Sequence, residues 1–331
     1  MLRQNLMRAA RLHGIKDLQL EELPVPEPGP GELLVRVEAC GVCPTDARKY
    51  AIGVSDGEYP VNPGHEWVGV VEAAGPEADG WAPGDRVYGD TYGGFAELAL
   101  VPARPGGWSC GATRIDPAVP AERAVFLEPL ADCLHAVHDQ ARVVAGDPVL
   151  VFSAGPMGLQ ITALANRAGA RVLVVEPIAE RRQIARTFGA ERAVSPEEWR
   201  RAAQAFVPGD GFAAVIIAVG KAGLVSQAIE AAAPGGRVVA FAGFGNEPAA
   251  VIDMNRIHYG EVELLGSHWV GTPPNQRLDR YAQACDLLTS PDLDLERLVT
   301  RVIGFDQLED ALVRHPDHRE LKTVLIPGQP R

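Results

Sequence analysis

Long apolar runs are missing from this 331-residue sequence: none reaches the length, about 18 residues, that a membrane-spanning helix needs. The first residues, Met1–Arg11, carry charges but no apolar core of a secretory signal. The sequence therefore predicts neither a membrane association nor export. The expected compartment is the cytoplasm.

Basic residues are in deficit: 31 Lys and Arg face 43 Asp and Glu, which leaves a net charge of −12. Nucleic acids and anionic membranes select basic surfaces, so neither is expected as a partner. A content of 47% hydrophobic and 22% charged residues is ordinary for a globular protein. The length is sufficient for two domains with separate cores.

Cysteine is also scarce. There are five, an odd number, and they are widely spread (Cys40, Cys43, Cys110, Cys133 and Cys285). This distribution disfavours a disulfide framework and favours metal-binding or buried thiols. Cys40 and Cys43 form a Cys-x-x-Cys, but no second pair is present to complete a four-sulfur site.

Short apolar segments separated by Gly and Pro dominate the first part of the chain. They predict strands at Leu33–Ala39, Trp67–Ala73, Arg86–Gly89 and Phe95–Val101. This part is expected to be a small β-rich domain.

Apolar strands then alternate regularly with helices, which predicts a parallel sheet covered on both faces. The expected strands are Val149–Phe152, Arg171–Val175, Ala214–Ile217, Arg237–Phe241 and Glu263–Ser267, and the expected helices are Gly158–Ala168, Ala179–Phe188 and Leu224–Ala232. Helix Arg277–Leu288 and strand Thr323–Ile326 are expected to return to the first domain. The predicted fold is α/β: a doubly wound Rossmann sheet (residues 135–269) and a β-rich domain (residues 1–134 and 270–331).

A candidate dinucleotide turn, Ser153–Gly158, follows the first of these strands and precedes a helix. Such a turn brings backbone close to a pyrophosphate at a helix N-terminus. Gly155 and Gly158 keep two of the three glycines of the pattern, with Pro156 and Met157 between them, whereas Ser153 replaces the first glycine. The alternative is a strand–turn–helix in an α/β domain that binds no nucleotide.

Glu176 ends the second strand, where a carboxylate accepts both ribose hydroxyls of NAD and repels the 2′-phosphate of NADP. NAD is therefore expected rather than NADP. Arg181 and Arg182 follow closely and could instead stack on adenine or tolerate a phosphate.

Three later strand ends are expected to complete the cofactor groove, since ligands bind at the carboxyl ends of parallel strands. They are Ala218-Val219, Ala242-Gly243 and Ser267-His268. Each is equally explained as an ordinary strand-to-loop junction.

Candidate metal ligands lie in the first domain. Cys43 follows a strand, and His65 and Glu66 follow Pro63-Gly64. A thiolate, an imidazole and an oxygen ligand suit a catalytic Zn²⁺ with one open position. Neither segment is predicted to be helical, so the ligands must converge through the fold. Taken singly, a buried thiol and a hydrogen-bonded histidine explain them as well.

The order of motifs resembles zinc-dependent medium-chain dehydrogenases of the alcohol and polyol type, such as sorbitol dehydrogenases. The matching segments are Gly41–Asp46, Gly64–Glu66, Gly84–Val87, Glu128–Ala131, the Ser153–Gly158 turn and Gly266-Ser267. The resemblance implies a GroES-like catalytic domain beside an NAD-binding domain. It implies oxidation of a secondary alcohol in a polyol, sugar or cyclitol to a ketone, and a homodimer or homotetramer.

The resemblance also implies roles for individual residues. Cys43 and His65 would bind the catalytic zinc. Glu66 would be a direct ligand or exchange with water, and Glu128 would be the third ligand or the partner of a bound water. Thr45 would take the substrate proton.

Two neighbours of these residues would have supporting roles: Asp46 would orient His65, and Cys40 would be a structural thiol.

Two departures from the family are visible. Many members carry four cysteines for a second zinc in the segment that is here Tyr88–Phe95, which has none. One zinc per chain is therefore expected. Arg48 stands where members commonly have a histidine that relays the proton, and an arginine cannot accept it. Arg48 could instead contact a substrate or cofactor phosphate.

A polyhydroxylated substrate suits the candidate pocket residues Tyr50, Trp67, Tyr92 and His268, although each is equally explained by packing. Two rival functions remain. One is a zinc-free, NADP-dependent reductase of simple aldehydes or ketones with the same fold. The other is a non-catalytic NAD-binding regulatory or structural protein.

Overall fold

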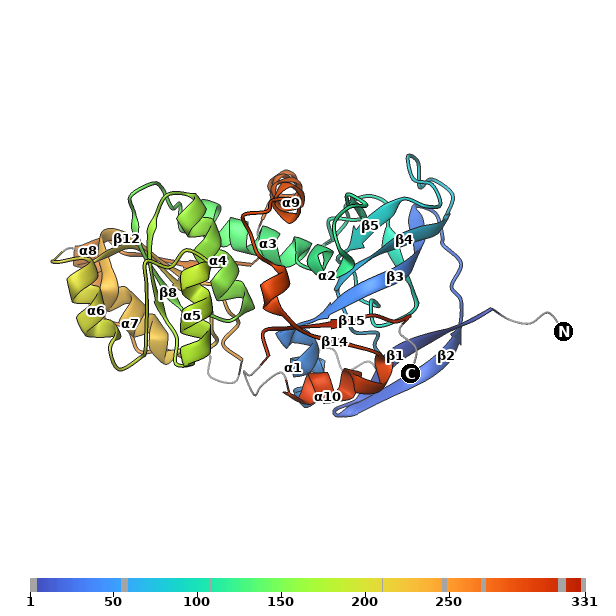
Figure 1. Ribbon diagram of the computed structural model, residues 1–331, viewed down its shortest axis with the longest axis horizontal. Coiled ribbons are helices and arrows are strands. Elements are labelled where there is room, and N and C mark those ends of the chain that lie inside the picture. Colours follow the sequence, from blue (N-terminus) through green and yellow to red (C-terminus); the bar gives the residue numbers. More distant parts are fainter. Residues whose placement is uncertain are drawn as a thin grey trace. The chain divides into compact units, whose positions relative to one another are not determined.

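The computed structural model describes residues 5–54, 59–107, 109–209, 211–245, 249–268, 272–314 and 320–328. The chain forms two compact units, Met1–Pro129 with Pro273–Arg331 and Leu130–Thr272 (Figure 1). The predicted boundaries after residues 134 and 269 lie close to these. The first differs because helix α3 (Leu127–Leu134) runs through the junction.

The first unit is built on a mostly antiparallel seven-stranded sheet of order β14-β15-β3-β4-β5-β7, with β6 also paired to β3. Its strands are β3 (Glu32–Val42), β4 (Glu66–Ala74), β5 (Arg86–Gly89), β6 (Leu98–Pro102), β7 (Thr113–Arg114), β14 (Val299–Ile303) and β15 (Lys322–Leu325), beside the hairpin β1 (Leu6–Gly14)–β2 (Asp17–Pro24). Its helices are α1 (Pro44–Ile52), α2 (Ala121–Ala124), α9 (Pro274–Leu288) and α10 (Leu308–Arg314), with single 3-10 turns at Glu296–Leu298 and Phe305–Gln307.

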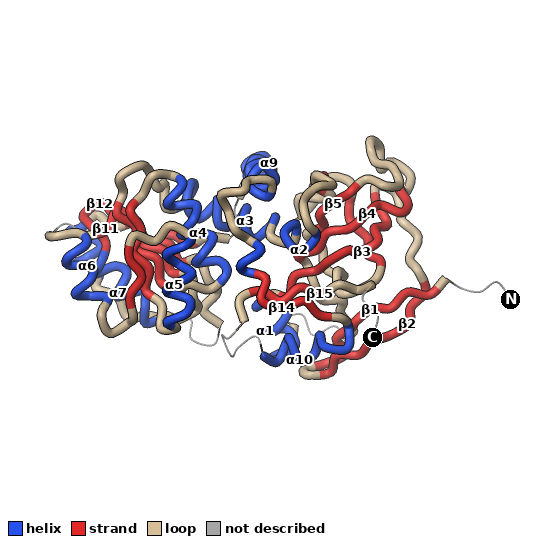
Figure 2. Tube along the Cα trace, in the orientation of Figure 1, coloured by secondary structure: helices blue, strands red, loops and turns tan. Residues whose placement is uncertain are grey.

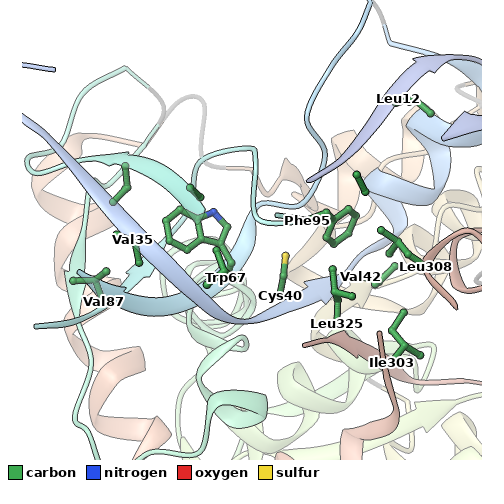
Figure 3. Packing of buried hydrophobic residues seen from close by; sticks show 14 of the residues in the cluster. Leu12, Val35, Cys40, Val42, Trp67, Val87, Phe95, Ile303, Leu308 and Leu325 are labelled. Carbon is green, nitrogen blue, oxygen red and sulfur yellow. The ribbon is translucent and has the colours of Figure 1, made fainter. Parts of the chain in front are cut away.

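The core of this unit follows from the alternation of side chains along β3. Leu33, Val35 and Val37 point to the same face and are buried. They pack around Trp67, which is fully buried (Figure 3). The closing strand β15 pairs antiparallel with the end of β3, so the last part of the chain lies beside Cys40–Val42.

The sequence predicts no helix after Cys43, and this prediction is wrong. Helix α1 begins at Pro44, directly after Cys43. Proline suits the first helical position, and Asp46 at the third position accepts the backbone N–H of Cys43 at 3.3 Å. The signals for a helix start were therefore present in the sequence.

The second unit contains a six-stranded parallel sheet of order β10-β9-β8-β11-β12-β13. Its strands are β8 (Pro148–Phe152), β9 (Arg171–Val175), β10 (Arg192–Val194), β11 (Phe212–Ile217), β12 (Ala232–Ala240) and β13 (Glu263–Gly266). Its helices are α4 (Pro156–Arg167), α5 (Ala179–Thr187), α6 (Trp199–Phe206), α7 (Gly223–Ala231) and α8 (Met254–Gly260), with a π-helical turn at His135–Gln140 after α3.

Helices α4 and α5 cover one face of this sheet, and α6 and α7 cover the other (Figures 1 and 2). The strand order reverses between β8 and β11, which is the doubly wound arrangement. The predicted α/β fold, a doubly wound parallel sheet with a β-rich domain, is confirmed. In the described part of the chain, no helix has both the length and the apolar character to cross a membrane.

Candidate metal and nucleotide sites

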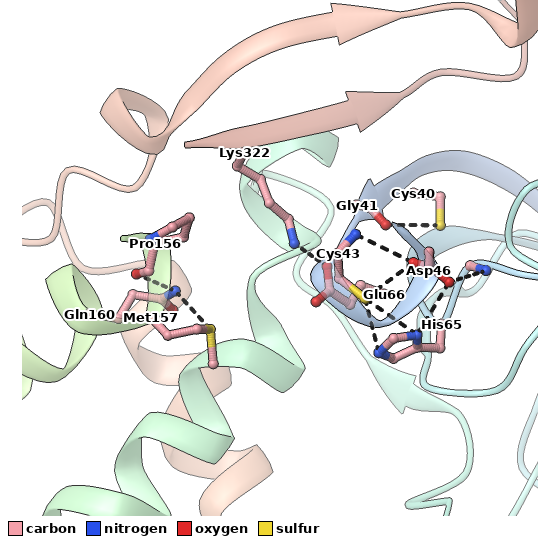
Figure 4. Close-up of polar contacts among 11 residues, drawn as sticks. Cys40, Gly41, Cys43, Asp46, His65, Glu66, Pro156, Met157, Gln160 and Lys322 are labelled. Atoms are coloured by element: carbon pink, nitrogen blue, oxygen red, sulfur yellow. Dashed lines mark hydrogen bonds and ion pairs between the residues drawn. The ribbon is translucent and has the colours of Figure 1, made fainter. Parts of the chain in front are cut away.

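The thiol of Cys43 and the imidazole of His65 meet in the first unit (Figure 4). Cys43 lies between the end of β3 and the start of α1, and His65 directly precedes β4. Cys43 Sγ is 3.7 Å from His65 Nε2. A tetrahedral Zn²⁺ with ordinary bond lengths separates a sulfur and a nitrogen ligand by about 3.6 Å. The two side chains therefore fit one zinc ion.

Asp46 holds both segments in place. It is buried, and its carboxylate accepts the Gly64 N–H at 3.0 Å and lies 3.2 Å from Cys43 Sγ. Its Oδ1 is 3.9 Å from His65 Nδ1, which is too long for a hydrogen bond but close enough for a charge interaction. Asp46 thus fixes the start of α1 against the turn that carries His65.

Two glutamates complete the cluster. Ligand atoms of His65, Glu66 and Glu128 lie within 4.8 Å of one another, and so do those of Cys43, Asp46 and His65. His65 belongs to both groups. The two groups together offer a thiol, an imidazole and carboxylates, which are donors suited to zinc, on either side of His65.

Lys322, on β15, is a site residue that the sequence did not reveal. Its ammonium group is buried and forms an ion pair with Glu66 (Figure 4). Gly41 makes this pair possible, because a Cβ at Gly41 would lie only 2.4 Å from Glu66 Oε2 and 2.7 Å from the Lys322 side chain. No motif signals this contact, because it arises from the pairing of β15 with β3.

Burial and neighbouring charges shift the pKa values of the cluster. Burial raises the pKa of Cys43 to about 11, and the Asp46 carboxylate adds to this. Burial likewise raises the pKa of Glu128 to about 7, with Glu66 and Asp90 contributing repulsion. In the absence of a cation, Cys43 is therefore largely protonated at neutral pH, and Glu128 becomes largely protonated below pH 7; a bound cation must displace these protons.

His65 and Asp46 behave as an ionised pair. Burial acts to lower the pKa of His65, but the nearby Cys43 and Asp46 outweigh it and raise this pKa well above its usual value. Burial acts to raise the pKa of Asp46, but His65 and the Gly64 N–H lower it on balance. A bound cation would take over the role of the imidazolium proton.

Thr45 is exposed in the first turn of α1, two positions after Cys43. Cys40 is fully buried, and its thiol lies 3.6 Å from the carbonyl oxygen of Gly41. It is absent from both groups of candidate ligands, which fits a structural thiol.

The four candidate pocket residues fare differently. Trp67 is a core residue, and Tyr50 is buried with its hydroxyl donating to Glu309 at 2.8 Å, so both interpretations as pocket residues are wrong. Tyr92 is 42% exposed, and its ring meets the His65 ring edge-on at 5.4 Å. His268 is exposed in the second unit.

The second unit carries the predicted nucleotide turn. Gly155 caps α4, with Pro156 and Met157 in its first turn. A Cβ at Gly158 would lie 2.1 Å from the carbonyl oxygen of Ser153, so only glycine fits there. Ser153 has φ +95°, a left-handed conformation that favours glycine, and its hydroxyl accepts the Gly155 N–H at 3.1 Å. The turn keeps the required shape despite the serine.

Glu176 is buried at the end of β9 and fixed by backbone donors. Its two carboxylate oxygens accept the N–H groups of Ala154 at 2.7 Å and Ile178 at 3.0 Å. Each carboxylate oxygen has a further lone pair. Glu176 is thus held against the nucleotide turn with acceptor capacity remaining.

The two arginines after Glu176 also have defined environments. Arg182 donates to the carbonyl oxygens of Glu176 at 2.7 Å and Pro177 at 2.6 Å. Arg181 is buried, and burial lowers its pKa. The Arg182 guanidinium is therefore committed to the backbone of the turn.

The three later strand ends lie along one edge of the sheet, since β8, β11, β12 and β13 are parallel and adjacent. Ala218 follows β11 and donates its N–H to Phe152 at 3.1 Å. The remaining predicted positions lie at the same edge: Val219, Ala242, Gly243, Ser267 and His268. They therefore lie along the same edge of the sheet as the nucleotide turn, with β13 two strands further from β8 than β11 is.

Two family models match the chain. Residues 29–106 match the alcohol dehydrogenase GroES-like domain, and residues 156–290 match the zinc-binding dehydrogenase domain. The first range contains Cys43, His65 and Glu66, and the second begins within the nucleotide turn at Pro156.

Known proteins are similar over nearly their whole lengths. An L-threonine 3-dehydrogenase of Pyrococcus abyssi is 30% identical, over 88% of this chain and 90% of its own. An erythritol/L-threitol dehydrogenase of Mycolicibacterium smegmatis is 30% identical, over 97% of this chain and 98% of its own. A zinc-binding dehydrogenase from Sinorhizobium meliloti, solved bound to NADP, superposes with a TM-score of 0.86 at 28% identity, over 98% of this chain and 100% of its own.

Proposed function

This chain belongs to the medium-chain dehydrogenase/reductase family and is an alcohol oxidoreductase, and we propose that it oxidises a secondary alcohol to a ketone with zinc and NAD. The reaction would be reversible. The observation that carries the proposal is the zinc-compatible distance of 3.7 Å between Cys43 Sγ and His65 Nε2, with Glu66 and Glu128 on a second group of candidate ligands that shares His65.

Cys43 and His65, with an oxygen from the Glu66 and Glu128 pair, would hold the ion. The ion would supply a Lewis acid that lowers the pKa of the substrate hydroxyl. Asp46 keeps the two ligand segments together, and Lys322 compensates the charge of Glu66. A zinc-free reductase would have no need of this set.

Proton transfer would pass through Thr45, an exposed residue two positions after Cys43 in the first turn of α1. Arg48 lies one turn further along α1 and is also exposed. Because an arginine stays protonated, the proton must leave from Thr45 to the cofactor ribose or to water rather than through residue 48.

The cofactor would be held by Gly155–Gly158 at its pyrophosphate and by Glu176 at its ribose hydroxyls. When bound, the nicotinamide accepts the hydride. Glu176 supports NAD as the cofactor, since a buried carboxylate repels the 2′-phosphate of NADP and Arg182 is engaged elsewhere.

For the substrate we propose a polyol, sugar or cyclitol. The oxygen-rich donor set of Glu66 and Glu128 supports it, as does the likeness to an erythritol/L-threitol dehydrogenase. The likeness to L-threonine 3-dehydrogenases supports a second class, the hydroxyl-bearing amino acids.

A single pair of variants tests the activity. In Cys43→Ser, zinc content measured by metal analysis and NADH formation on a polyol, cyclitol and hydroxy-amino acid panel should both fall to background. NAD binding, measured by fluorescence titration, should remain. The matched control Cys285→Ser, outside the candidate ligand groups, should keep all three. Full turnover in metal-free Cys43→Ser would overturn the zinc assignment.

Measured turnover also distinguishes the proposed dehydrogenase from the remaining alternative, a non-catalytic protein. A non-catalytic NAD-binding protein would bind NAD but contain no zinc and oxidise no alcohol on the panel.

We also propose a homodimer or homotetramer that uses the edge strand β13. Leu264 on this strand is 42% exposed, and β13 has a neighbour on one side only within the described sheet. An exposed apolar edge pairs readily with a second copy. Leu264→Lys should lower the mass measured by light scattering, whereas an unchanged oligomer would exclude this edge.

A further inference from the structure

One face of α1 joins the proton acceptor to two cations. Thr45, Arg48 and Lys49 are spaced three and four residues apart, so their side chains lie on the same face of the helix. Thr45 and Arg48 are exposed, and Lys49 is half-buried. Arg48 follows Thr45 by about 4.5 Å along the helix axis. Arg48 and Lys49, called the cationic strip below, therefore lie on the helix that begins beside Cys43.

These two cations differ from most others in the first unit. Exposed arginines there pair with carboxylates, for example Arg36 with Glu72 and Arg114 with Asp85, both at 2.9 Å. Within the described ranges, neither Arg48 nor Lys49 has a carboxylate within ion-pair distance. Two neighbouring like charges therefore have no counter-ion among the described residues, on the helix that begins beside Cys43.

Lys49 is also held in position. Its ammonium group lies 3.3 Å from the centre of the Tyr92 ring, a cation–π contact. The same ring contacts His65 edge-on. The Tyr92 ring thus lies in contact with both the Lys49 ammonium group and His65, a candidate zinc ligand.

We propose that Arg48 and Lys49 bind an anionic group of the substrate, a carboxylate or a phosphate, a few bonds from the oxidised carbinol. The inference rests on the proposed dehydrogenase activity and narrows its substrate class. An alcohol oxygen at the metal and Thr45 would place such a group against the strip. A neutral polyol leaves both cations without a ligand.

The overall charge makes local cations necessary for such a substrate. A net charge of −12 repels anions at long range. Two cations on the helix that begins beside Cys43 would offset this repulsion where the substrate binds. Arg48 supplies a planar fork that suits a carboxylate or a phosphate, and Lys49 supplies a point charge.

The test compares matched substrates with the zinc-loaded full-length protein and saturating NAD. One pair is glycerol 3-phosphate against glycerol, and the other is threonine against threonine amide. We expect kcat/KM to favour the anionic member of one pair by about tenfold or more. Preference for the phosphate or for the carboxylate identifies which anion is bound.

Variants connect the preference to the strip. Arg48→Gln and Lys49→Gln should each raise KM for the anionic member by about tenfold and leave the neutral member unchanged. Arg48→Lys should retain most of the preference. The control Arg104→Gln removes an exposed cation elsewhere in this unit and should change neither member. Calorimetric binding of glycerol 3-phosphate and threonine should follow the same order without turnover.

Three results would overturn the proposal: equal kcat/KM within both pairs, equal effects of the variants on anionic and neutral members, or a rise in KM for NAD alone. The last would assign the cations to the cofactor. Absence of any zinc-dependent NADH formation would instead count against the proposed function. In that case, calorimetric binding that is lost in Arg48→Gln and Lys49→Gln supports the strip, and binding unchanged in them overturns it.

Discussion

Glu66 and Glu128 reach the same imidazole but experience different charges. Glu66 is neutralised by the Lys322 ammonium group. Glu128 forms no ion pair among the described residues, and burial raises its pKa to about 7 although the charges of His65 and Lys322 act to lower it. The two carboxylates therefore have different charged surroundings although ligand atoms of both lie within 4.8 Å of His65. Because of this difference, substitutions of Glu66 and of Glu128 should change zinc binding in different ways.

Zinc affinity should become more dependent on pH below 7 because of Glu128. In the metal-free protein this carboxyl carries a proton below its pKa of about 7, and zinc must displace that proton. Affinity should therefore fall by up to about tenfold more per pH unit below 7 than above it. Chelator competition at pH 6 and pH 8 measures the change.

Glu128→Gln removes the carboxyl whose proton zinc must displace. The zinc affinity of this variant should therefore be lower at pH 8, and it should depend less on pH. The control Glu122→Gln, on α2 and outside both candidate ligand groups, should behave as the wild type. Equal slopes in the wild type and Glu128→Gln would exclude Glu128 from the metal site.

Ser153 shows a second residue-scale effect, a backbone conformation that its side chain disfavours. Its φ of +95° is strained for any residue with a Cβ, and the hydrogen bond between its hydroxyl and Gly155 offsets part of that strain. Ser153→Gly and Ser153→Ala both delete the hydroxyl, but only glycine relieves the strain. The glycine variant should be more stable than the alanine variant by about 1 kcal/mol. Denaturant unfolding measures this difference, and equal stabilities would indicate an unstrained turn.

At the scale of elements, the cluster is assembled by strand pairing. The closing strand β15 lies against β3, which places Lys322 beside Glu66 although 256 positions separate them in sequence. Burial acts to lower the pKa of Lys322, but Glu66 and Cys43 raise it on balance, so it stays charged. The last strand of the first unit therefore contributes a charged residue, Lys322, to the candidate metal site.

Lys322→Met should couple stability to zinc more strongly than the wild type. Loss of the buried partner leaves the Glu66 charge uncompensated, which costs about 3–5 kcal/mol in the metal-free protein. Zinc supplies a replacement positive charge, so the zinc-induced rise in Tm should be larger in Lys322→Met. Lys322→Arg keeps the positive charge, so the metal-free protein should lose less stability than it does in Lys322→Met. An identical zinc-induced rise in the wild type and Lys322→Met would show that Lys322 does not act through the site.

Local patterns could predict most elements but not this assembly. The alternation of apolar strands and helices predicts β8, β9, β11 and α4 because buried parallel strands are uniformly apolar. Pro44 and Asp46 are signals for the start of helix α1, but the segment was predicted to be a turn. Lys322 carries no motif, since only the pairing of distant strands makes it part of the site.

Over the whole molecule, the candidate ligands divide between the two units. Each unit has its own hydrophobic core, centred on Trp67 in the first and on β8 and β11 in the second. The metal cluster belongs to the first and the nucleotide turn to the second. This division was predictable because the motifs are local, whereas tyrosine and tryptophan roles were not, since packing and ligand binding select the same side chains.

Hydrogen exchange should therefore report zinc and NAD in different segments. Zinc binding to the NAD-free protein should slow exchange in residues 41–53 and 63–67, and NAD binding to the metal-free protein should slow it in residues 153–158 and 176–182. At about 100 times Kd, amides that exchange through opening of the bound site should slow by about 100-fold. Cys43→Ser should abolish the zinc effect and keep the NAD effect, whereas Gly158→Ala, which clashes with the Ser153 carbonyl, should do the reverse. NAD leaving residues 153–158 unprotected, or zinc protecting them as strongly as residues 41–53, would contradict the assignment of one ligand to each unit.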